Sequence, residues 1–545
     1  MTFTPPKMRM IVLFFAAFSC FAWIPQSVAA QDDSRLRVSL QSRISSTEKD
    51  VAPRTLVIHQ EIQHWNPKET AIIICDMWNQ HWCKGATARV AEMAPRMNEV
   101  LTIAREKGIT IIHAPSDTIG AYQNHPARKR AQQFRASGIE QRLGRGNLPS
   151  EADAEWPIDQ SDEGCDCTPT CPHGPPYPWK HQIDTLTIHD EDLISDSGME
   201  IGSYFEEKSI KNVILMGVHT NMCVIGRSFG LRNMVHLGKN VVLMRDLTDT
   251  MYNSKSAPFV SHFTGNSLMQ EYIESFVCPS MVSTDFTGKK QFRFKEDTRP
   301  LVAFVTAEHE YRSNQRFHEF AHELLLTKGV NCDFAAGDPD ANSPGRHNIE
   351  NLQILEDADL LFLSVRRRAL EEDKMNAVKK YVESGKPLVG IRTASHAFSL
   401  RERKPDPLVT WDELDNEVFG GNYTNHLGRE SGVTQVEIVP GMEGHPLLEG
   451  LNPAGFSKSL MVVQLPPIAF PQCAGSSGRN RNRYTAGTSV VDQSSSQGKS
   501  HLHLTGTLER LGEPGFQTID DEHFEYVIGQ PCGFAMKSLL ETVNE

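Results

Sequence analysis

The stretch of sequence that decides the fold is NVILMGVHTNMCV, residues Asn212 to Val224. Its first half is a continuous apolar run, which is typical of a strand buried on both faces of a parallel sheet. Gly217 ends this run, and Cys223 falls at the expected start of the next helix. A thiol in that place lies close to the positive end of the helix dipole and to free backbone N–H groups, which favour the thiolate and can hold an oxyanion. The stretch therefore predicts an α/β fold with a nucleophile at the carboxyl edge of its sheet.

Strands and helices alternate in the same way along two separate parts of the chain, which is the pattern of parallel sheets covered by helices. We expect strands at 71–75, 109–113, 213–216 and 241–245 in the first part, and at 301–306, 360–364 and 387–391 in the second. The expected helices are 88–107, 199–208 and 223–233, then 314–328 and 371–384. We therefore predict two doubly wound, parallel-sheet, three-layer α/β domains in tandem after a signal peptide, at 67–286 and 299–535, joined by a charged linker at 287–298.

The composition is that of a folded, acidic protein. Of 545 residues, 39% are hydrophobic and 23% are charged, which excludes wholesale disorder. Asp and Glu number 68 against 55 Lys and Arg, so the net charge is −13. Nucleic acid is therefore not an expected partner, because binding to phosphates needs clustered Lys and Arg.

The N-terminus has the pattern of an export signal. Lys7 and Arg9 precede an apolar run from Ile11 to Ile24, and Ala30 ends a small-residue cleavage site. The run has 14 residues, fewer than the roughly 20 that span a bilayer. We expect residues 1–30 to be removed and residues 31–66 to form an N-terminal extension. The mature protein would then be periplasmic or secreted, with no stable membrane span.

Export changes the interpretation of the cysteines, because an oxidising compartment permits disulfides. Cys165, Cys167 and Cys171 lie in CDCTPTC, inside a loop rich in Pro and Gly. As a zinc site this motif is a poor match, since thiolate ligands usually come as paired C-x₂₋₄-C units. A disulfide-stapled loop is the preferred interpretation, and its pairing does not follow from the sequence.

Two polar residues could act with Cys223. Asp76 directly follows the apolar run AIIIC, so its carboxylate would lie at the carboxyl edge of a neighbouring strand, and Lys180 opens the segment after the Pro-rich loop. Taken singly, each has a plainer explanation. An Asp after a strand is most often a cap or turn residue, a lone Lys is usually solvated, and Cys223 could be a buried hydrophobe or half of a disulfide.

Together these features resemble the isochorismatase-like cysteine hydrolase superfamily, which includes nicotinamidases and carbamoyl-amide hydrolases. The resemblance covers residues 67–285 and rests on Asp76, on Lys180 and above all on GVHTNMCV at the strand–helix turn. It implies that Cys223 attacks a carbonyl carbon and forms an acyl-enzyme. It also implies that Asp76 is the general base and that Lys180 keeps Asp76 ionised.

Two details of the resemblance concern the turn and the lysine. It implies a cis peptide between Val218 and His219, which would aim backbone N–H groups at an oxyanion next to the nucleophile. The segment around the lysine departs from the family, because WKHQ follows a Cys- and Pro-rich insertion. Arg227, Lys239 or an uncharged mechanism therefore remain alternatives for the role of the cation.

Nicotinamidase-type members of the superfamily hold a divalent ion with an Asp and His residues near the second strand. The candidates here are His113, Asp117 and His125, with His81 separately, and their spacing does not reproduce the family's D-x-H pattern. We assign no cofactor on this basis and keep a divalent metal as the less favoured alternative. Five aromatic residues could line an apolar substrate pocket or belong to the core: Trp78, Trp82, Tyr122, Trp179 and Phe229.

The second part resembles the ThuA-like (trehalose-utilisation) family, which has a class I glutamine-amidotransferase-like fold. The resemblance covers residues 299–456 and rests on RPLVAFVTAEHEYRSNQ, ADLLFLSVRRRAL, KPLVGIRTASHAF and FGGNYTNHLG. Arg392 stands where amidotransferases of this fold carry their nucleophilic cysteine, so glutaminase chemistry is not expected. Four polar residues at expected strand ends are candidates for binding a sugar-like ligand: His309, Glu310, His396 and His426.

Residues 464–511 lose the hydrophobic periodicity of the rest of the second part and are rich in Ser, Gly, Arg, Gln and Thr. Reread one base later, residues 499–512 would give a strand and a turn that resemble the closing strand of ThuA-like domains. We hypothesise that about 460–511 results from a reading-frame slip, which the nucleotide sequence would test.

The leading hypothesis is an exported hydrolase that cleaves a C–N bond of a small amide, imide or ureide through Cys223. Its second domain would bind a sugar-like ligand. The alternative is a non-catalytic carbohydrate-binding or accessory protein with a degenerate hydrolase scaffold. In both cases the expected partners are small molecules.

Overall fold

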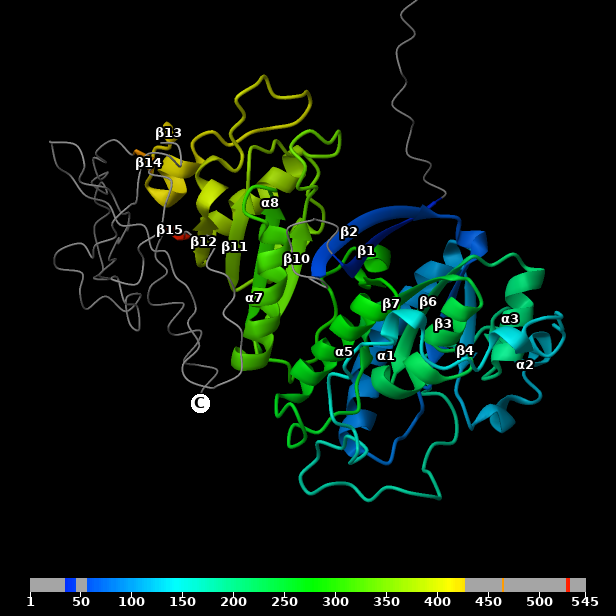
Figure 1. Cartoon of the computed structure of the whole chain (residues 1–545). Helices are drawn as coiled ribbons and strands as arrows, with labels where there is room; N and C mark the ends of the chain where they lie inside the picture. The colour runs from blue at the N-terminus through cyan, green and yellow to red at the C-terminus, as the bar shows by residue number, and fades with distance from the viewer. Residues whose placement is uncertain (1–34, 46–55, 427–462, 465–525, 530–545) are drawn as a thin grey trace, which may run out of the picture.

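The computed structural model describes residues 35–45, 56–426, 463–464 and 526–529, which form two α/β halves, each built around its own sheet (Figure 1). The expected signal peptide lies outside the described residues, as does the segment of the suspected frame slip apart from residues 463 and 464. Among the described helices, none combines the length and the apolar character needed to cross a membrane.

The first sheet has eight strands in the order β2-β1-β8-β7-β6-β3-β4-β5. The strands are β1 (Leu36–Ser45), β2 (Leu56–Trp65), β3 (Thr70–Cys75), β4 (Thr110–Ala114), β5 (Leu193–Ile194), β6 (Asn212–Val218), β7 (Asn240–Asp249) and β8 (Ser280–Met281). From β8 to β5 all neighbours are parallel. Every residue of the central strands β3 and β6 is buried, as expected for strands that are covered on both faces.

Helices cover both faces of this sheet. On one face lie α1 (Lys84–Glu106) and α6 (Thr284–Thr287), and on the other lie α2 (Pro126–Ala131), α3 (Gly198–Glu207), α4 (Leu231–His236) and α5 (His262–Phe276). The long helix α1 buries residues at intervals of three and four, such as Val90, Met93, Met97 and Val100, because one stripe of a helix faces the sheet. The result is the three-layer α/β architecture that the sequence predicts.

The expected N-terminal extension contributes two strands to this sheet. β1 alternates buried Leu36, Val38 and Leu40 with more exposed polar residues, the period-two pattern of a strand with one covered face. It pairs antiparallel with both β2 and β8, so one edge of the sheet is antiparallel. The sequence predicted parallel strands only, so this antiparallel edge of the sheet differs from the prediction.

The second sheet has the order β10-β9-β11-β12-β15. Its strands are β9 (Leu301–Ala307), β10 (Asn331–Ala336), β11 (Leu360–Val365), β12 (Leu388–Ile391) and β15 (Tyr526–Gly529), and a separate pair is formed by β13 (Asn425–His426) and β14 (Val463–Gln464). The first four strands are parallel and β15 is antiparallel to β12. Helix α7 (Ser313–Lys328) covers one face and α8 (Glu372–Glu383) the other.

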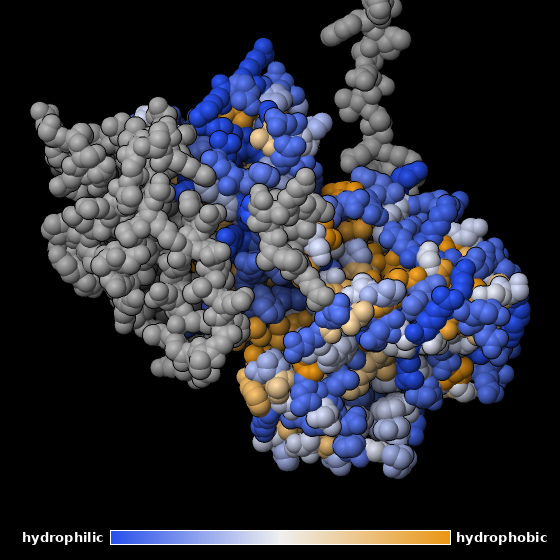
Figure 2. All heavy atoms as spheres, viewed as in Figure 1, coloured by the Kyte–Doolittle hydropathy of each residue, from blue (hydrophilic) through white to orange (hydrophobic). Residues whose placement is uncertain are grey.

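The β1–β2 hairpin joins the two halves. Ile58 of β2 packs into the core of the second sheet. The side chain of Gln60 donates to the carbonyl of Phe334 at 2.7 Å and accepts from the N–H of Ala336 at 2.8 Å, both on β10. On the face shown in Figure 2, hydrophobic residues gather near this meeting of the halves, and the outer surface of the first half is mostly hydrophilic.

Charged side chains complete the junction. Arg43 of β1 lies 3.0 Å from both Glu271 and Glu274 of α5, and Glu271 also accepts a hydrogen bond from His322 of α7 at 2.7 Å. A cavity of about 600 Å³ opens beside this network and is lined by charged side chains from both halves. The ion network therefore ties the hairpin, the first sheet's helix layer and the second half together.

The network predicts that stability depends on pH. Burial would raise the pKa of Glu271, but Arg43 and His322 lower it to about 2. The contribution of Glu271 is therefore complete above its unfolded-state pKa of about 4.3 and is lost as the pH falls toward 2. The hydrogen bond that His322 donates to Glu271 raises the pKa of His322, so this contribution is complete below about pH 6.5 and is lost as the pH rises through the raised value.

We expect Glu271→Gln to lower the free energy of unfolding by about 2–4 kcal/mol near pH 6, because the buried Arg43 loses the charge of one of its two acids. The difference from the wild type should shrink below about pH 4, where the wild-type carboxylate becomes protonated. Urea unfolding of both proteins across this pH range measures the effect, and Glu61→Gln, at an exposed carboxylate of the same hairpin, is the control. A difference that does not change with pH would contradict the role of the ion network.

Candidate active site

The carboxyl ends of β3 and β6 lie against each other in the middle of the first sheet. Cys75 pairs with Gly217 at the last step of the parallel register. Gly217 has a φ of 117°, and a Cβ atom there would lie 2.1 Å from the carbonyl oxygen of Cys75. Only glycine allows this contact. It brings Asp76, which follows β3, and the turn that follows Val218 to the same edge of the sheet.

A π-helical turn at Thr220–Val224 follows β6 and carries Cys223. The Val218–His219 peptide before it is cis, at the bond where the resemblance places one. Two backbone N–H groups of the turn donate to the carbonyl oxygen of His219. The turn is therefore compact, and its geometry is set by residues on both sides of the cysteine.

The continuous helix expected at 223–233 is wrong. The chain leaves helical geometry between residues 227 and 230, and α4 begins only at Leu231. A Cβ atom on Gly230 would lie 2.7 Å from the carbonyl oxygen of Val224 and 2.9 Å from the nitrogen of Arg227, so the chain folds back tightly at this glycine. The dipole of a long helix therefore does not act on the thiol, and its environment is set by neighbouring side chains.

Asp76 is the buried partner of the cysteine. Its backbone has a φ of 47°, which is uncommon for a residue other than glycine, and its side chain is fully buried. One carboxylate oxygen accepts a hydrogen bond from the N–H of Ser116 at 2.7 Å, and the other from Nε of Arg227 at 3.3 Å. The thiol of Cys223 lies close enough to this carboxylate to influence its pKa. Burial raises the pKa of Asp76, although Arg227 and the hydrogen bonds oppose the rise.

Cys223 is the accessible member of this pair. The residue is partly exposed, whereas Asp76 beneath it is not. Burial of the thiol and the charge of Asp76 raise the pKa of Cys223 to about 12, and Arg227 opposes this rise. The resting thiol is therefore neutral and lies close to the carboxyl group of Asp76. A proton must pass from sulfur to oxygen before or while the sulfur attacks a substrate.

The cation beside the carboxylate is Arg227. Its guanidinium bridges Asp76 and Asp117, with a nitrogen–oxygen distance of 3.3 Å to each. Burial lowers the pKa of Arg227, but Cys223, Asp76 and Asp117 together raise it above its ordinary value, so the arginine stays charged. The spacing of Arg227 from Cys223 is the feature of the sequence that could indicate its role. In a helical turn, a residue four positions after Cys223 lies on the same face as Cys223. The N–H of Arg227 indeed donates to the carbonyl of Cys223 at 3.0 Å.

The two lysines considered for this role lie elsewhere. Lys180 is exposed, its backbone N–H donates to the side chain of Asn79, and within the described part of the chain its ammonium group forms no ion pair. Lys239 pairs with Glu206 at 3.3 Å. The structure thus brings the predicted acid and thiol together and places an arginine, not a lysine, against the acid.

The residues considered for a divalent metal do not come together. His113 is buried and hydrogen-bonds to two neighbouring side chains, Asp117 pairs with Arg227, and His125 accepts a hydrogen bond at the start of α2. His81 stacks against aromatic rings. Within the described residues, the side chains that are close enough together to hold an ion are four cysteines, which lie in a different place.

Aromatic rings from two segments stack next to the end of β3. Trp78 lies 4.6 Å from Trp179 between ring centroids, and Trp179 lies 4.3 Å from Tyr177. His81 lies beside both tryptophans, with its ring centroid 6.0 Å from that of Trp78 and 5.6 Å from that of Trp179, and burial lowers its pKa to about 4, so the ring is neutral. Phe229, by contrast, belongs to the core. Trp78, two residues beyond Asp76, is buried, and Tyr177 exposes its ring to solvent.

The candidate ligand residues of the second half lie at the carboxyl ends of β9 and β12. Glu310 pairs with an arginine of the loop after β11 at 3.1 Å. His396 stacks on Tyr423 with 4.5 Å between ring centroids. His309 is exposed next to Glu310, and the side chain of His426 lies outside the described residues. Aromatic and charged groups thus share one edge of the second sheet.

No protein-family model matches the chain, and no curated protein matches it. Solved structures match its N-terminal part. A cysteine hydrolase from Pseudomonas syringae pv. phaseolicola 1448A is 16% identical with a TM-score of 0.26, and the match covers 40% of this chain and 91% of that one. An isochorismatase family protein from Burkholderia thailandensis is 12% identical with a TM-score of 0.23, covering 40% and 93%. A ribonuclease from Caenorhabditis elegans is 14% identical with a TM-score of 0.21, covering 41% and 83%. What the site does is therefore argued from its own residues.

The position of Arg227 predicts which cation controls the reactivity of the thiol. We expect Arg227→Met to slow alkylation of Cys223 by iodoacetamide at about pH 8 by roughly tenfold, because the pKa of the thiol would rise by about one unit without the guanidinium. Lys180→Met should leave the rate unchanged. Timed labelling followed by peptide mass spectrometry measures both rates. A lysine variant that labels as slowly as the arginine variant would show that Lys180 reaches the site in solution.

Proposed function

We propose that this protein is a hydrolase that cleaves the C–N bond of a small amide, imide or ureide through an acyl-enzyme on Cys223. The observation that carries the proposal is the contact of a partly exposed thiol with a buried carboxylate, beside a charged arginine, where two central parallel strands end. A nucleophile, a base within hydrogen-bond reach and a group that orients the base are the parts that acyl transfer requires.

The proposed reaction begins with Asp76 and ends with its original charge restored. The carboxylate of Asp76 takes the thiol proton as the sulfur of Cys223 attacks the carbonyl carbon. The same proton then passes to the leaving nitrogen, the C–N bond breaks, and an amine and a thioester remain. A water molecule next attacks the thioester, gives a proton to Asp76, and the thiol re-forms as the acid product leaves.

The pKa values explain why proton transfer and attack would be coupled. Burial and the charge of Asp76 raise the pKa of the thiol to about 12, and burial also raises the pKa of Asp76. A free thiolate is therefore unfavourable at rest. The sulfur becomes nucleophilic as its proton moves and as a substrate displaces water from the partly exposed face. Arg227 limits the energetic cost of the negative charge that the sulfur and Asp76 share.

The aromatic stack supports a planar or apolar substituent on the substrate, because flat groups stack on exposed aromatic rings such as that of Tyr177. We further propose that the protein acts after export, in the periplasm or outside the cell. The aromatic and charged residues at the edge of the second sheet would bind a sugar-like ligand there. Small molecules are the partners that this function needs.

A panel of small amides, imides and ureides tests the proposal on the purified full-length protein. We expect Cys223→Ala and Asp76→Asn each to lower kcat/KM by at least about a thousandfold, because each removes a group that bonds or moves a proton in the reaction. Cys332→Ser, at a thiol far from the site, should keep full activity. Acid quenching during turnover should trap a mass increase on the peptide that contains Cys223.

Two other outcomes would decide against the proposal. Hydrolysis that survives in Cys223→Ala would point to chemistry without a cysteine nucleophile. Absence of any turnover, together with saturable binding of oligosaccharides by the wild type, would favour the carbohydrate-binding alternative.

A further inference from the structure

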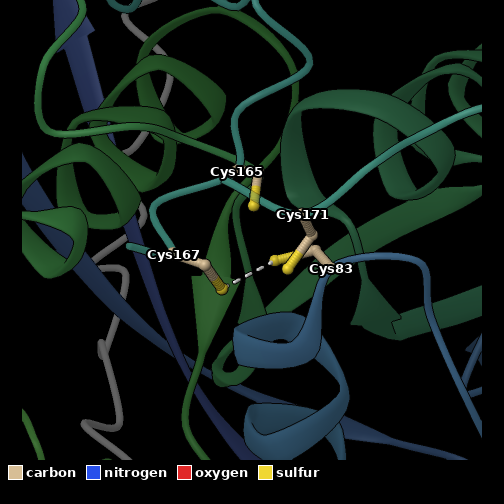
Figure 3. Close-up of side chains that lie close together, drawn as sticks. All are labelled: Cys83, Cys165, Cys167 and Cys171. Carbon is tan, nitrogen blue, oxygen red and sulfur yellow. Dashed lines mark hydrogen bonds between the residues drawn. The ribbon is translucent and has the colours of Figure 1, made fainter. Parts of the chain in front are cut away.

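Four cysteines come together near the candidate active site (Figure 3). Cys83 is the N-cap of α1, and Cys165, Cys167 and Cys171 lie in the loop between α2 and β5. Their four sulfur atoms all lie within 4.8 Å of one another, and those of Cys83 and Cys167 are 3.7 Å apart. All four are free thiols. The disulfide-stapled loop that the sequence favoured is therefore not what the structure shows.

This arrangement has the geometry of four ligands around one ion. Zinc binds thiolate sulfur at about 2.3 Å, so four sulfurs at tetrahedral corners lie about 3.8 Å apart. A disulfide would instead bring two sulfurs to about 2.05 Å and leave the other pair free to lie anywhere. We propose that Cys83, Cys165, Cys167 and Cys171 bind one zinc ion in a closed structural site. Each thiol would release its proton to solvent as its bond to zinc forms, so no oxidant is needed.

The start of α1 supplies the hydrogen bonds that such a site requires. The backbone N–H groups of residues 84, 85 and 86 donate to the sulfurs of Cys171, Cys167 and Cys83 at 3.5, 3.3 and 3.5 Å. One zinc ion and four thiolates carry a net charge of −2, which the positive end of this long helix stabilises. The guanidinium of Arg89, one turn further along α1, is close enough to Cys83 for their charges to interact.

The ion would fix a segment that has little regular structure of its own. Residues 152–192 are all described and contain neither helix nor strand. Loops of this length need other ties, because they lack the hydrogen-bond ladders of helices and sheets. Gly164 presses directly on the backbone of Met251, where a Cβ atom would lie 2.4 Å from the carbonyl. Three of the four thiols belong to this segment, and Cys83 connects it to α1.

The same four cysteines lie under the turn that carries the candidate nucleophile. Met222 and Met251 pack against them. The side chain of Asn221 accepts from the N–H of Met251 at 3.0 Å and donates to its carbonyl at 2.9 Å, which fixes the turn just before Cys223. The segment also carries Trp179 of the aromatic stack. Together with the proposed function, this implies that the ion positions both the nucleophile's turn and one wall of the substrate site.

The first test is the metal content of the full-length protein purified without added metal. We expect inductively coupled plasma mass spectrometry to find about one zinc per chain in the wild type. The zinc content of Cys167→Ser and of Cys171→Ser should be at least roughly tenfold lower. Cys332→Ser is the matched control, because its thiol hydrogen-bonds to the carbonyl of Ala321 and lies outside the group, and it should keep one zinc. A wild-type content near zero, or variants that all keep the metal, would overturn the proposal.

Two measurements on the wild type remain decisive where a variant fails to fold. Cobalt exchanged into the protein should give the intense absorption of tetrahedral cobalt bound to thiolates, and a weak octahedral spectrum would overturn the proposal. Denatured, unreduced protein treated with a chelator and iodoacetamide should carry alkyl groups on all four cysteines. Disulfides among these four cysteines would also overturn it.

These readouts are independent of the proposed hydrolase activity. A protein that holds zinc on the four thiols and cleaves none of the tested amides would contradict the function and leave the zinc site standing. A protein that cleaves an amide through Cys223 and contains cystines in the loop would contradict the zinc site and leave the function standing. When both hold, removal of zinc should raise KM and lower kcat, because the ion positions both a wall of the substrate site and the turn that carries Cys223.

Discussion

The close contact of β6 with β3 at Gly217 is the constraint on which the candidate site depends. A parallel sheet offers a site where its strands end, but only when neighbouring strands end at the same level. Here the register pairs Cys75 with Gly217, and the missing side chain leaves room for the carbonyl of Cys75. The carboxylate that follows one strand and the thiol that follows the other therefore share one edge. A shift of the register by a single residue would separate Asp76 from Cys223.

The second constraint is electrostatic, because the carboxyl group of Asp76 is buried where water does not reach it. A buried carboxylate is costly unless it is paired and hydrogen-bonded. Ser116 and Arg227 donate hydrogen bonds to it, and the thiol lies close by. The same contacts prepare the carboxylate for catalysis, because they oppose the rise in its pKa that burial causes. Arg227 is itself partly exposed, so a substrate that covers it would exclude water and strengthen its interaction with both negative groups.

The central elements could be predicted from the sequence, because each has a simple local pattern. The strands β3 and β6 are continuous apolar runs, and the long helices have apolar residues every three or four positions. The edges of the sheets could not. Strand β1 of the hairpin pairs with β8 at Gln41 and Ser280. These residues are far apart in the chain, so no local sequence pattern predicts the pairing. The acid and the thiol were predictable from their places after strands. The identity of the cation was not, because whether Lys180 or Arg227 reaches Asp76 depends on the path of a long insertion and on the break at Gly230.

The cysteine cluster also combines residues that are distant in the sequence. Its surroundings distinguish the two interpretations of the motif, a zinc site and a set of disulfides. CDCTPTC offers three thiols, and the fourth, Cys83, comes from α1, 84 residues before Cys167, so that only the fold completes the set. Disulfides and zinc both restrain a long loop, but they place different demands on their surroundings. A cystine is neutral and gains little from donors, whereas zinc-bound thiolates carry charge that must be stabilised. The N–H groups at the start of α1 point at three of the four sulfurs, which is the surrounding that thiolates need and cystines do not.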